Sequence, residues 1–114
     1  MLIPIVIPHI REAWCRETAH PSYRKKWSEN NRACGQCCVT ALLIHDAFGF
    51  DVAKCKVERF WHYFNVTPGL EIIDLTSEQF GKDGIDYCVI TKCNVKKLLA
   101  EEDVRNRFEL LKQR

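Results

Sequence analysis

A strong net charge is missing from this sequence. Its 17 Lys and Arg residues nearly balance its 15 Asp and Glu residues, which leaves a net charge of +2 at pH 7. Chains that bind nucleic acid or an anionic membrane surface through charge usually carry a clear basic excess. The balance therefore predicts no nucleic-acid partner and no membrane partner.

Long hydrophobic runs are also missing. The most apolar stretch, residues 39–44, is followed closely by Asp46 and is far shorter than the roughly 20 residues that span a bilayer. Near the start, the apolar residues Leu2 to Ile7 are interrupted by Pro4. Neither a basic leader nor a small-residue cleavage site accompanies them, so they do not resemble a signal peptide. Together these absences predict a cytoplasmic protein.

The sequence has no internal repeat, no low-complexity segment and no linker. Its 114 residues fit one domain, since domains typically run to roughly 100–150 residues. A hydrophobic content of 46% and a charged content of 28% are those of a folded globular chain. We therefore expect residues 1–114 to form a single domain.

Cysteine is the residue type in excess, with seven copies at positions 15, 34, 37, 38, 55, 88 and 93. An odd number cannot pair completely within one chain, and a cytoplasmic location disfavours disulfides. Three uses for the cysteines compete, namely a disulfide framework, a metal site, or reduced thiols with one reactive member, and the first is disfavoured on these grounds. A redox pair is a further alternative.

Two cysteine patterns support the redox pair and the metal site. Cys34 and Cys37 have the Cys-x-x-Cys spacing of a thiol-disulfide oxidoreductase, but residues 19–33 lack the apolar run that would form the strand preceding such a motif. With Cys88 and Cys93 the same pair offers four thiolates for zinc, but alternation along a strand would point Cys88 and Cys93 to opposite faces. We therefore expect no metal and no cofactor, and the oxidoreductase function stays an alternative.

Hydrophobic periodicity predicts an α+β fold with a central helix packed on an antiparallel sheet of three to five strands. The central helix spans Cys37–Phe48 and ends at Gly49, because its apolar residues keep helical spacing and glycine readily ends a helix. The β-branched and aromatic runs predict strands at Val52–Val57, Phe60–Val66, Glu71–Leu75 and Asp86–Thr91.

The remaining segments are expected around this helix and sheet. Thr76-Ser77-Glu78-Gln79 has the form of a capping box and predicts a short helical turn. The other predicted elements are a helix at residues 9–18, a polar surface connection at residues 19–33, and a terminal helix from about Val95 to Lys112.

The turn sequence Thr67-Pro68-Gly69 predicts that the second and third strands form an antiparallel hairpin. If the turn is centred near Pro68, His62 lies directly opposite Asp74, with their Cβ atoms roughly 4.5–5.5 Å apart on one face. An imidazole and a carboxylate at that separation can form a hydrogen bond that fixes the histidine tautomer and favours the imidazolium. The hairpin therefore predicts a His62–Asp74 pair. Asn65 is placed on the same face, and it is interpreted as a turn asparagine rather than as a site residue.

Cys37 is the candidate nucleophile. It lies in the first turn of the central helix, where unpaired N–H groups and the helix dipole favour a thiolate, the more so beside an imidazolium. The backbone N–H of Cys37 and the side chain of Gln36 are candidate donors to a developing oxyanion. Cys37, His62 and Asp74 would then supply the nucleophile, the base and the group that orients the base. The other histidines and the tryptophans are assigned to surface or structural roles and to core packing: His9, His20 and His45, and Trp14, Trp27 and Trp61.

Three sequence blocks are distinctive when taken together: Gly35-Gln36-Cys37-Cys38, His62-Tyr63-Phe64-Asn65 and Asp74-Leu75-Thr76. They are similar to the YunG-like family of small uncharacterised bacterial proteins. The resemblance spans about residues 27–112. Two positions depart from the family pattern, because Cys38 stands where alanine is usual and Phe50 stands where a second glycine often follows Gly49.

The resemblance implies a fold and a site. The family's blocks in turn resemble the papain and transglutaminase type of fold, with a nucleophile at a helix N-terminus and its partners on adjacent strands. This implies a papain-like cysteine hydrolase core in which Cys37, His62, Asp74 and Gln36 carry out hydrolysis or acyl transfer at an amide, ester or thioester. The substrate is left open as a peptide, an amine or a small acyl compound. A non-catalytic binding or regulatory domain on the same scaffold is the alternative.

Overall fold

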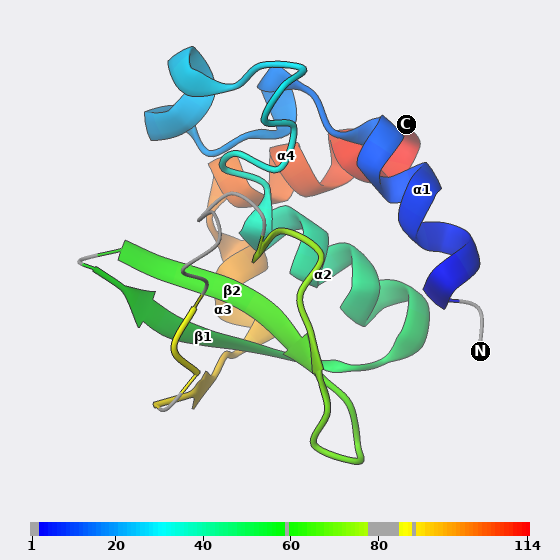
Figure 1. The fold of residues 1–114 in the computed structure, drawn as a ribbon, viewed down its shortest axis with the longest axis vertical. Helices are drawn as coiled ribbons and strands as arrows, with labels where there is room; N and C mark the ends of the chain where they lie inside the picture. The colour runs from blue at the N-terminus through cyan, green and yellow to red at the C-terminus, as the bar shows by residue number, and fades with distance from the viewer. Residues whose placement is uncertain (1–2, 59, 78–84, 88) are drawn as a thin grey trace.

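A computed structural model describes residues 3–58, 60–77, 85–87 and 89–114, with side chains from Pro8 onward (Figure 1). Along the chain, the elements are α1 (Ile3–Ala13), the 3₁₀ turns η1 (Arg16–Thr18) and η2 (Pro21–Lys26), α2 (Cys37–Phe48), β1 (Asp51–Val57), β2 (Phe60–Val66), β3 (Ile72–Ile73), β4 (Thr91–Lys92), α3 (Val95–Ala100) and α4 (Glu102–Gln113). No helix in these residues is long and apolar enough to cross a bilayer.

The sheet is antiparallel, with the described strands in the order β3-β2-β1-β4. β1 and β2 pair along their whole length, from Asp51 opposite Val66 to Val57 opposite Phe60. β3 and β4 are short and lie at the two edges. The predicted α+β class with an antiparallel sheet is confirmed.

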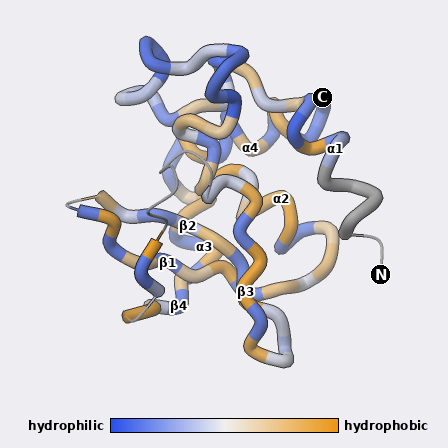
Figure 2. Tube along the Cα trace, viewed as in Figure 1, coloured by the Kyte–Doolittle hydropathy of each residue, from blue (hydrophilic) through white to orange (hydrophobic). Residues whose placement is uncertain are grey.

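Helix α2 forms the centre of the fold, as predicted. Figure 1 shows it between the sheet and α4, and Figure 2 shows it mainly in hydrophobic colours. The helix ends at Gly49, whose φ of 76° is a left-handed conformation that glycine adopts without strain. Leu42 and Ile44 are 1% exposed, and burying each such side chain stabilises the fold by about 1.5–3 kcal/mol.

The two faces of the β1–β2 hairpin carry different residues. Tyr63 and Asn65 point toward α2, where the Asn65 amide donates to the carbonyl of Ala41 at 2.9 Å. His62 and Phe64 alternate with them, because side chains along a strand point to opposite faces in turn. The expectation that Asn65 shares a face with His62 is therefore wrong, since three residues separate them.

The N-terminal helix differs from the prediction. It spans Ile3–Ala13 rather than residues 9–18, and Pro8 lies inside it. A proline inside a helix removes one backbone donor and crowds the preceding turn, which is why the sequence pattern indicated a helix that begins after Pro8. The helix ends before Trp14 because the chain turns there to bury that side chain completely, with the indole N–H donating to the Thr40 hydroxyl at 2.9 Å.

The terminal helix is divided in two. Glu101 has an extended backbone conformation and separates α3 from α4. In one continuous helix the five-residue step from Leu99 to Val104 would rotate their side chains about 140° apart. The break lets both apolar faces reach the core, where Val104 and Phe108 are buried and Leu99 packs against them.

The predicted strands at Glu71–Leu75 and Asp86–Thr91 are both shorter in the structure. The first is reduced to β3. The second overlaps β4 (Thr91–Lys92) only at Thr91, and β4 pairs with Ala53 and Lys54. Tyr87 lies outside the strands, and its ring packs edge-on against Phe64. Residues 78–84 and 88 are outside the described part of the chain, so the helical turn expected from the Thr76–Gln79 capping box lies largely outside it too.

The segment at residues 19–33 is more ordered than a polar surface connection. It contains η2, and Ala19 and Trp27 form a small apolar cluster with Cys34. The Arg32 guanidinium fastens the segment to the end of α1, because it donates to the carbonyls of Arg11, Glu12 and Trp14. This packing holds η2 beside the N-terminus of α2.

Candidate functional site

Cys37 is the first residue of α2 and is partly exposed. The preceding corner requires Gly35, whose φ is 72° and whose added Cβ would lie 3.0 Å from the backbone N of His20. Glycine is the residue that tolerates both the left-handed conformation and this close approach. The sequence therefore fixes where α2 begins and places Cys37 at its N-terminus.

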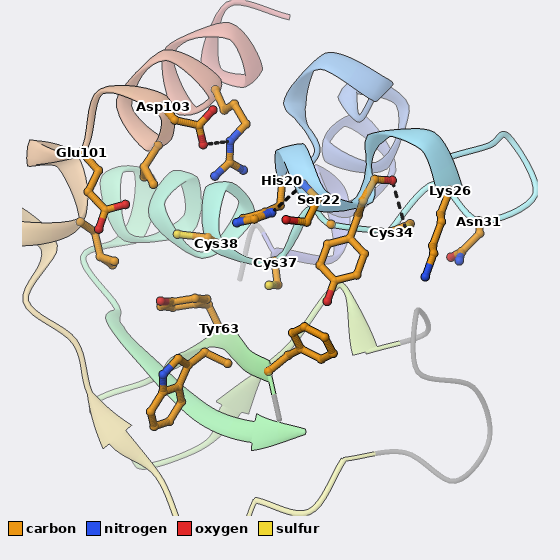
Figure 3. A pocket seen from close by; sticks show the side chains of 17 residues that line it. His20, Ser22, Lys26, Asn31, Cys34, Cys37, Cys38, Tyr63, Glu101 and Asp103 are labelled. Carbon is orange, nitrogen blue, oxygen red and sulfur yellow. Dashed lines mark hydrogen bonds and ion pairs between the residues drawn. The ribbon is translucent and has the colours of Figure 1, made fainter. Parts of the chain in front are cut away.

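A cavity of about 470 Å³ opens in front of Cys37. Figure 3 shows the Cys37 sulfur in the cavity, with Tyr63 on one side and Cys34 and Lys26 on the other. The volume is that of a small-molecule site. Much of the wall is aromatic or apolar, and charged groups interrupt it: the apolar set is Tyr23, Phe60, Trp61, Tyr63, Leu98 and Val104, and the charged set is Lys26, Glu101, Asp103 and Arg107.

His62 and Asp74 form the predicted pair. The Nε2 atom of His62 lies 2.7 Å from Oδ2 of Asp74, and both side chains are almost fully buried, at 0% and 5% exposure. A hydrogen bond of this length between an imidazole and a carboxylate orients the ring and leaves Nδ1 as its other reactive nitrogen.

The hairpin register differs from the predicted one by two residues. Asn65 pairs with Ile73, so the turn is centred at Gly69 rather than Pro68 and Asp74 follows the strand opposite Phe64. The loop is longer because Thr67 donates to the Glu71 carbonyl and closes it one step further along. A shift of two residues keeps the same face, and the diagonal neighbour remains within reach of an imidazole.

Asp74 accepts hydrogen bonds from further residues that sequence reasoning missed. The Tyr87 hydroxyl donates to Oδ2 at 2.6 Å, and the backbone N–H of Thr76 donates to Oδ1 at 3.2 Å. The spacing Asp74-Leu75-Thr76 is that of an Asx turn and could have indicated the Thr76 contact. Tyr87 is distant in sequence and no local pattern indicates its contact. Both oxygens of the Asp74 carboxylate therefore accept hydrogen bonds from groups other than His62, and these bonds fix its position.

The environment of His62 favours its protonated form. Burial alone lowers its pKa, but hydrogen bonding to Asp74 and to Cys37 and the negative charge of both groups outweigh burial and raise the pKa to about 9, from 6.5. The His62 imidazole thus interacts with the carboxylate on one side and with the Cys37 sulfur on the other. His62 and Asp74 are brought together as the sequence predicts, and the Cys37 thiol lies near enough to contribute to the pKa of His62.

Burial distinguishes Cys37 from most of the other cysteines. It raises the pKa of the Cys38 thiol to about 12, and it also raises the pKa of Cys34, Cys55 and Cys93. A buried apolar setting disfavours the thiolate, which is the reactive form. Cys38 lines the same cavity, but its raised pKa makes it a poor nucleophile near neutral pH.

Gln36 is fully buried and its side chain is engaged away from the cavity lining. Its amide Nε2 donates to the carbonyl of Cys15 at 2.8 Å, and its Oε1 accepts from the Thr18 hydroxyl at 2.7 Å. A primary amide has two N–H groups, so one remains after the bond to Cys15. The oxyanion role of Gln36 stays a prediction, and the observed contacts anchor the start of α2 to η1.

The remaining assigned residues fall into two groups. Trp14 and Trp27 are buried as expected, whereas Trp61 is 43% exposed and the core assignment is wrong for it. Trp61 lines the cavity, and the ammonium groups of Lys54 and Lys56 each lie 4.3 Å from its ring centroid, which compensates for its exposure. Three histidines lie outside the pair with Asp74: His9 is exposed, His20 lines the cavity, and His45 contacts the Phe50 carbonyl.

The described residues can be compared with what a metal site and a redox site each require. Across them, His, Cys, Asp and Glu side chains form no group of three or more that could hold a metal ion, and Cys88 lies outside them. Helix α2 follows η2 and turns rather than a strand, and the described sheet pairs are antiparallel. A thioredoxin-like motif requires a parallel strand before its helix, so the surroundings of Cys34 and Cys37 do not match one.

Removing the Tyr87 hydroxyl is expected to alter the His62–Asp74 pair without disturbing the fold. In Tyr87→Phe the Oδ2 atom loses one of its two donors, so more of the carboxylate charge acts on His62. We expect the upper pH limb of Cys37 alkylation to move to higher pH, by about half a unit. The measurement is the pH dependence of iodoacetamide labelling, compared between the wild type and Tyr87→Phe. A shift to lower pH would contradict the proposed hydrogen-bond competition.

Comparison with known proteins places the chain in a family. The family model described as YunG protein matches residues 5–114. The chain belongs to the YunG family. A relative described as uncharacterized protein YunG, from Bacillus subtilis (strain 168), is 41% identical over 71 residues, which cover 62% of this chain. The match spans 56% of the length of that relative. No solved structure matches the chain.

Proposed function

We propose that this member of the YunG family is a cysteine-dependent hydrolase or acyltransferase that acts on an amide, ester or thioester. The observation that carries the proposal is the buried His62, which is hydrogen-bonded to Asp74 at 2.7 Å and interacts with Cys37 at the head of α2. A nucleophile, a base and a group that orients the base occur together beside a cavity, as covalent catalysis requires.

The chemistry follows from these positions. The Cys37 sulfur attacks the acyl carbonyl, and the oxyanion that forms accepts from the backbone N–H of Cys37 at the N-terminus of α2. His62 gives its Nδ1 proton to the leaving amine, alcohol or thiol, which departs as the C–N, C–O or C–S bond breaks. Water or an acceptor amine then attacks the Cys37 thioester, loses a proton to His62 and releases the acyl product. Asp74 holds the imidazole in position throughout.

The scaffold supports a papain-like description. A central helix that begins at the nucleophile and packs on an antiparallel sheet carrying the base is the arrangement that the papain and transglutaminase type of fold uses. We propose this relationship for the core built from α2, β1 and β2. No cofactor takes part in the proposed reaction.

Selective alkylation tests the proposed nucleophile. With limiting iodoacetamide near pH 6.5, Cys37 is expected to react before the other cysteines, at least tenfold faster than Cys38, because the imidazolium of His62 supports its thiolate. Peptide mapping by mass spectrometry gives the order of labelling, and Cys37→Ser provides the matched control. Labelling of Cys34 or Cys38 first would overturn the assignment of the nucleophile.

The competing function is a binding or regulatory domain that keeps this scaffold without turnover. The cavity beside Cys37 favours it as much as it favours catalysis, because a cavity of about 470 Å³ also suits a bound ligand. A screen with acyl and amide electrophiles, followed by intact-mass analysis of the adduct, separates the two functions. A catalytic site gives an acyl adduct on Cys37 that decays with release of product, whereas a binding domain gives an unreactive Cys37.

A further inference from the structure

One charged side chain in the cavity wall is not used by the proposed chemistry. Arg107, on α4, is 3% exposed and lines the same cavity as Cys37. Its Nε donates to Oδ2 of Asp103 at 2.9 Å, and its Nη1 donates to the Thr18 carbonyl at 3.4 Å (Figure 3 marks the first contact beside Asp103). Within the described residues, Nη2 has no hydrogen-bond partner.

The Nη2 atom of Arg107 can donate hydrogen bonds to a further acceptor. A guanidinium has five N–H donors in a planar arrangement that matches a carboxylate, and Nη2 of Arg107 is not among the buried polar atoms that lack a partner, so it is open to the cavity. The present partner satisfies it only in part, because Asp103 is half-exposed and also lies 4.0 Å from Arg24. The pKa of His20, which also lines the cavity, is lowered mainly by burial and next by the positive charge of Arg107. The charge of Arg107 therefore acts on groups in the cavity.

The surroundings of Arg107 define the rest of the ligand. Tyr63, Leu98 and Val104 line the cavity together with Arg107, as do Cys37 and Cys38. An apolar group packs on these side chains, while a carboxylate meets the guanidinium. Glu101 also lines the cavity and opposes a second negative charge, so one carboxylate is the charge the site accepts.

We propose that Arg107 is a substrate-binding residue that recognises a carboxylate, and that the substrate joins this carboxylate and an apolar side chain to the acyl group attacked by Cys37. The inference rests on the proposed function. A free N-acyl amino acid and the C-terminal residue of a peptide share this chemistry: the amide C–N bond breaks, the amino acid leaves with the proton from His62, and its carboxylate stays at Arg107 until release.

A matched pair of alkylating probes tests the role of Arg107. N-bromoacetyl-phenylalanine and its C-terminal amide differ only in the negative charge, and each can alkylate Cys37. We expect the acid to react about tenfold faster than the amide in the wild type, and the ratio to fall to about one in Arg107→Gln. Protection of Cys37 by N-acetylphenylalanine, compared with protection by a longer peptide ending in phenylalanine, distinguishes the two substrate sources. Protection by neither would contradict the proposal.

A second variant keeps the test valid if Arg107→Gln fails to fold. Asp103→Asn removes the carboxylate that competes for the guanidinium, so the acid-to-amide ratio is expected to rise about threefold. Glu101→Gln removes an equal charge from the cavity without touching the bonds of Arg107, and is expected to raise the ratio less. Equal rates for acid and amide in the wild type, or equal effects of the two variants, would overturn the assignment.

Plain iodoacetamide separates this inference from the proposed function. It carries no carboxylate, so its rate with Cys37 depends on the thiolate and not on Arg107. Fast iodoacetamide labelling of Cys37 with no preference for the acid probe would sink the role of Arg107 alone. Slow, unselective iodoacetamide labelling would instead contradict the proposed nucleophile.

Discussion

Replacing His62 by alanine is expected to lower the rate of Cys37 alkylation near pH 6.5 by about tenfold to a hundredfold. An ordinary cysteine titrates near pH 8.5, so roughly 1% of it is thiolate at pH 6.5, whereas an imidazolium partner keeps most of the thiol ionised. The lower intrinsic reactivity of a stabilised thiolate offsets part of this gain. Turnover of any acyl substrate should fall by a larger factor, about 10²–10⁴, because the proton donor to the leaving group is also lost.

The pH dependence of the Cys37 alkylation rate tests the same prediction in more detail. In the wild type the alkylation rate should show a plateau between two apparent titrations that belong to the Cys37–His62 pair as a unit. The plateau should disappear in His62→Ala and remain in His9→Ala, which changes an exposed histidine away from the cavity. If the wild type and His62→Ala both followed a single ordinary thiol titration, Cys37 would be a structural cysteine.

Replacing Asp74 by asparagine should weaken the imidazolium while leaving the fold intact. The amide is nearly isosteric with the carboxylate and keeps an oxygen that accepts from His62, but it carries no charge. The upper limb of the alkylation profile is therefore expected to shift to lower pH, because the carboxylate that favours protonated His62 is gone. Asp51→Asn is the matched control, since its contact with Lys92 at 3.6 Å is an exposed ion pair of small energetic effect.

The same substitution should flatten the dependence of stability on pH. The folded pKa of His62, about 9, lies above its unfolded value of 6.5. Its protonation therefore stabilises the fold fully below about pH 6.5, and this contribution is lost as the pH rises toward 9. The loss amounts to about 3 kcal/mol of unfolding free energy. Urea denaturation at several pH values measures it, and in Asp74→Asn the loss should be at least halved. An equal loss in both proteins would contradict the pairing.

Local patterns were sufficient for the centre of the fold. The bounds of α2 and its glycine stop follow from helical spacing and from the freedom of Gly49, and β1 and β2 follow from their β-branched and aromatic residues. The outer segments depend on contacts that no local pattern encodes. The break at Glu101 exists because the faces of α3 and α4 must both reach the core.

The candidate site was predictable to a similar degree. Side chains alternate between the two faces of a strand, so a two-residue change in register leaves His62 and Asp74 on the same face. The pairing could therefore be predicted although the register was not. The contacts of Tyr87 and Arg107 come from residues far away in sequence, and their roles require the tertiary structure. Trp61 was misplaced because an aromatic residue in a strand is usually buried, whereas here it lines a cavity.

The central claim is that Cys37 is held as a thiolate by His62, and thiolate ultraviolet absorbance tests it without any substrate. The quantity to measure is the absorbance difference between the wild type and Cys37→Ser as the pH is raised from about 4 to 10. The account predicts that this difference is already present near pH 6.5 and is lost there in His62→Ala. A difference that appears only near pH 8.5, at the same pH with and without His62, would contradict it.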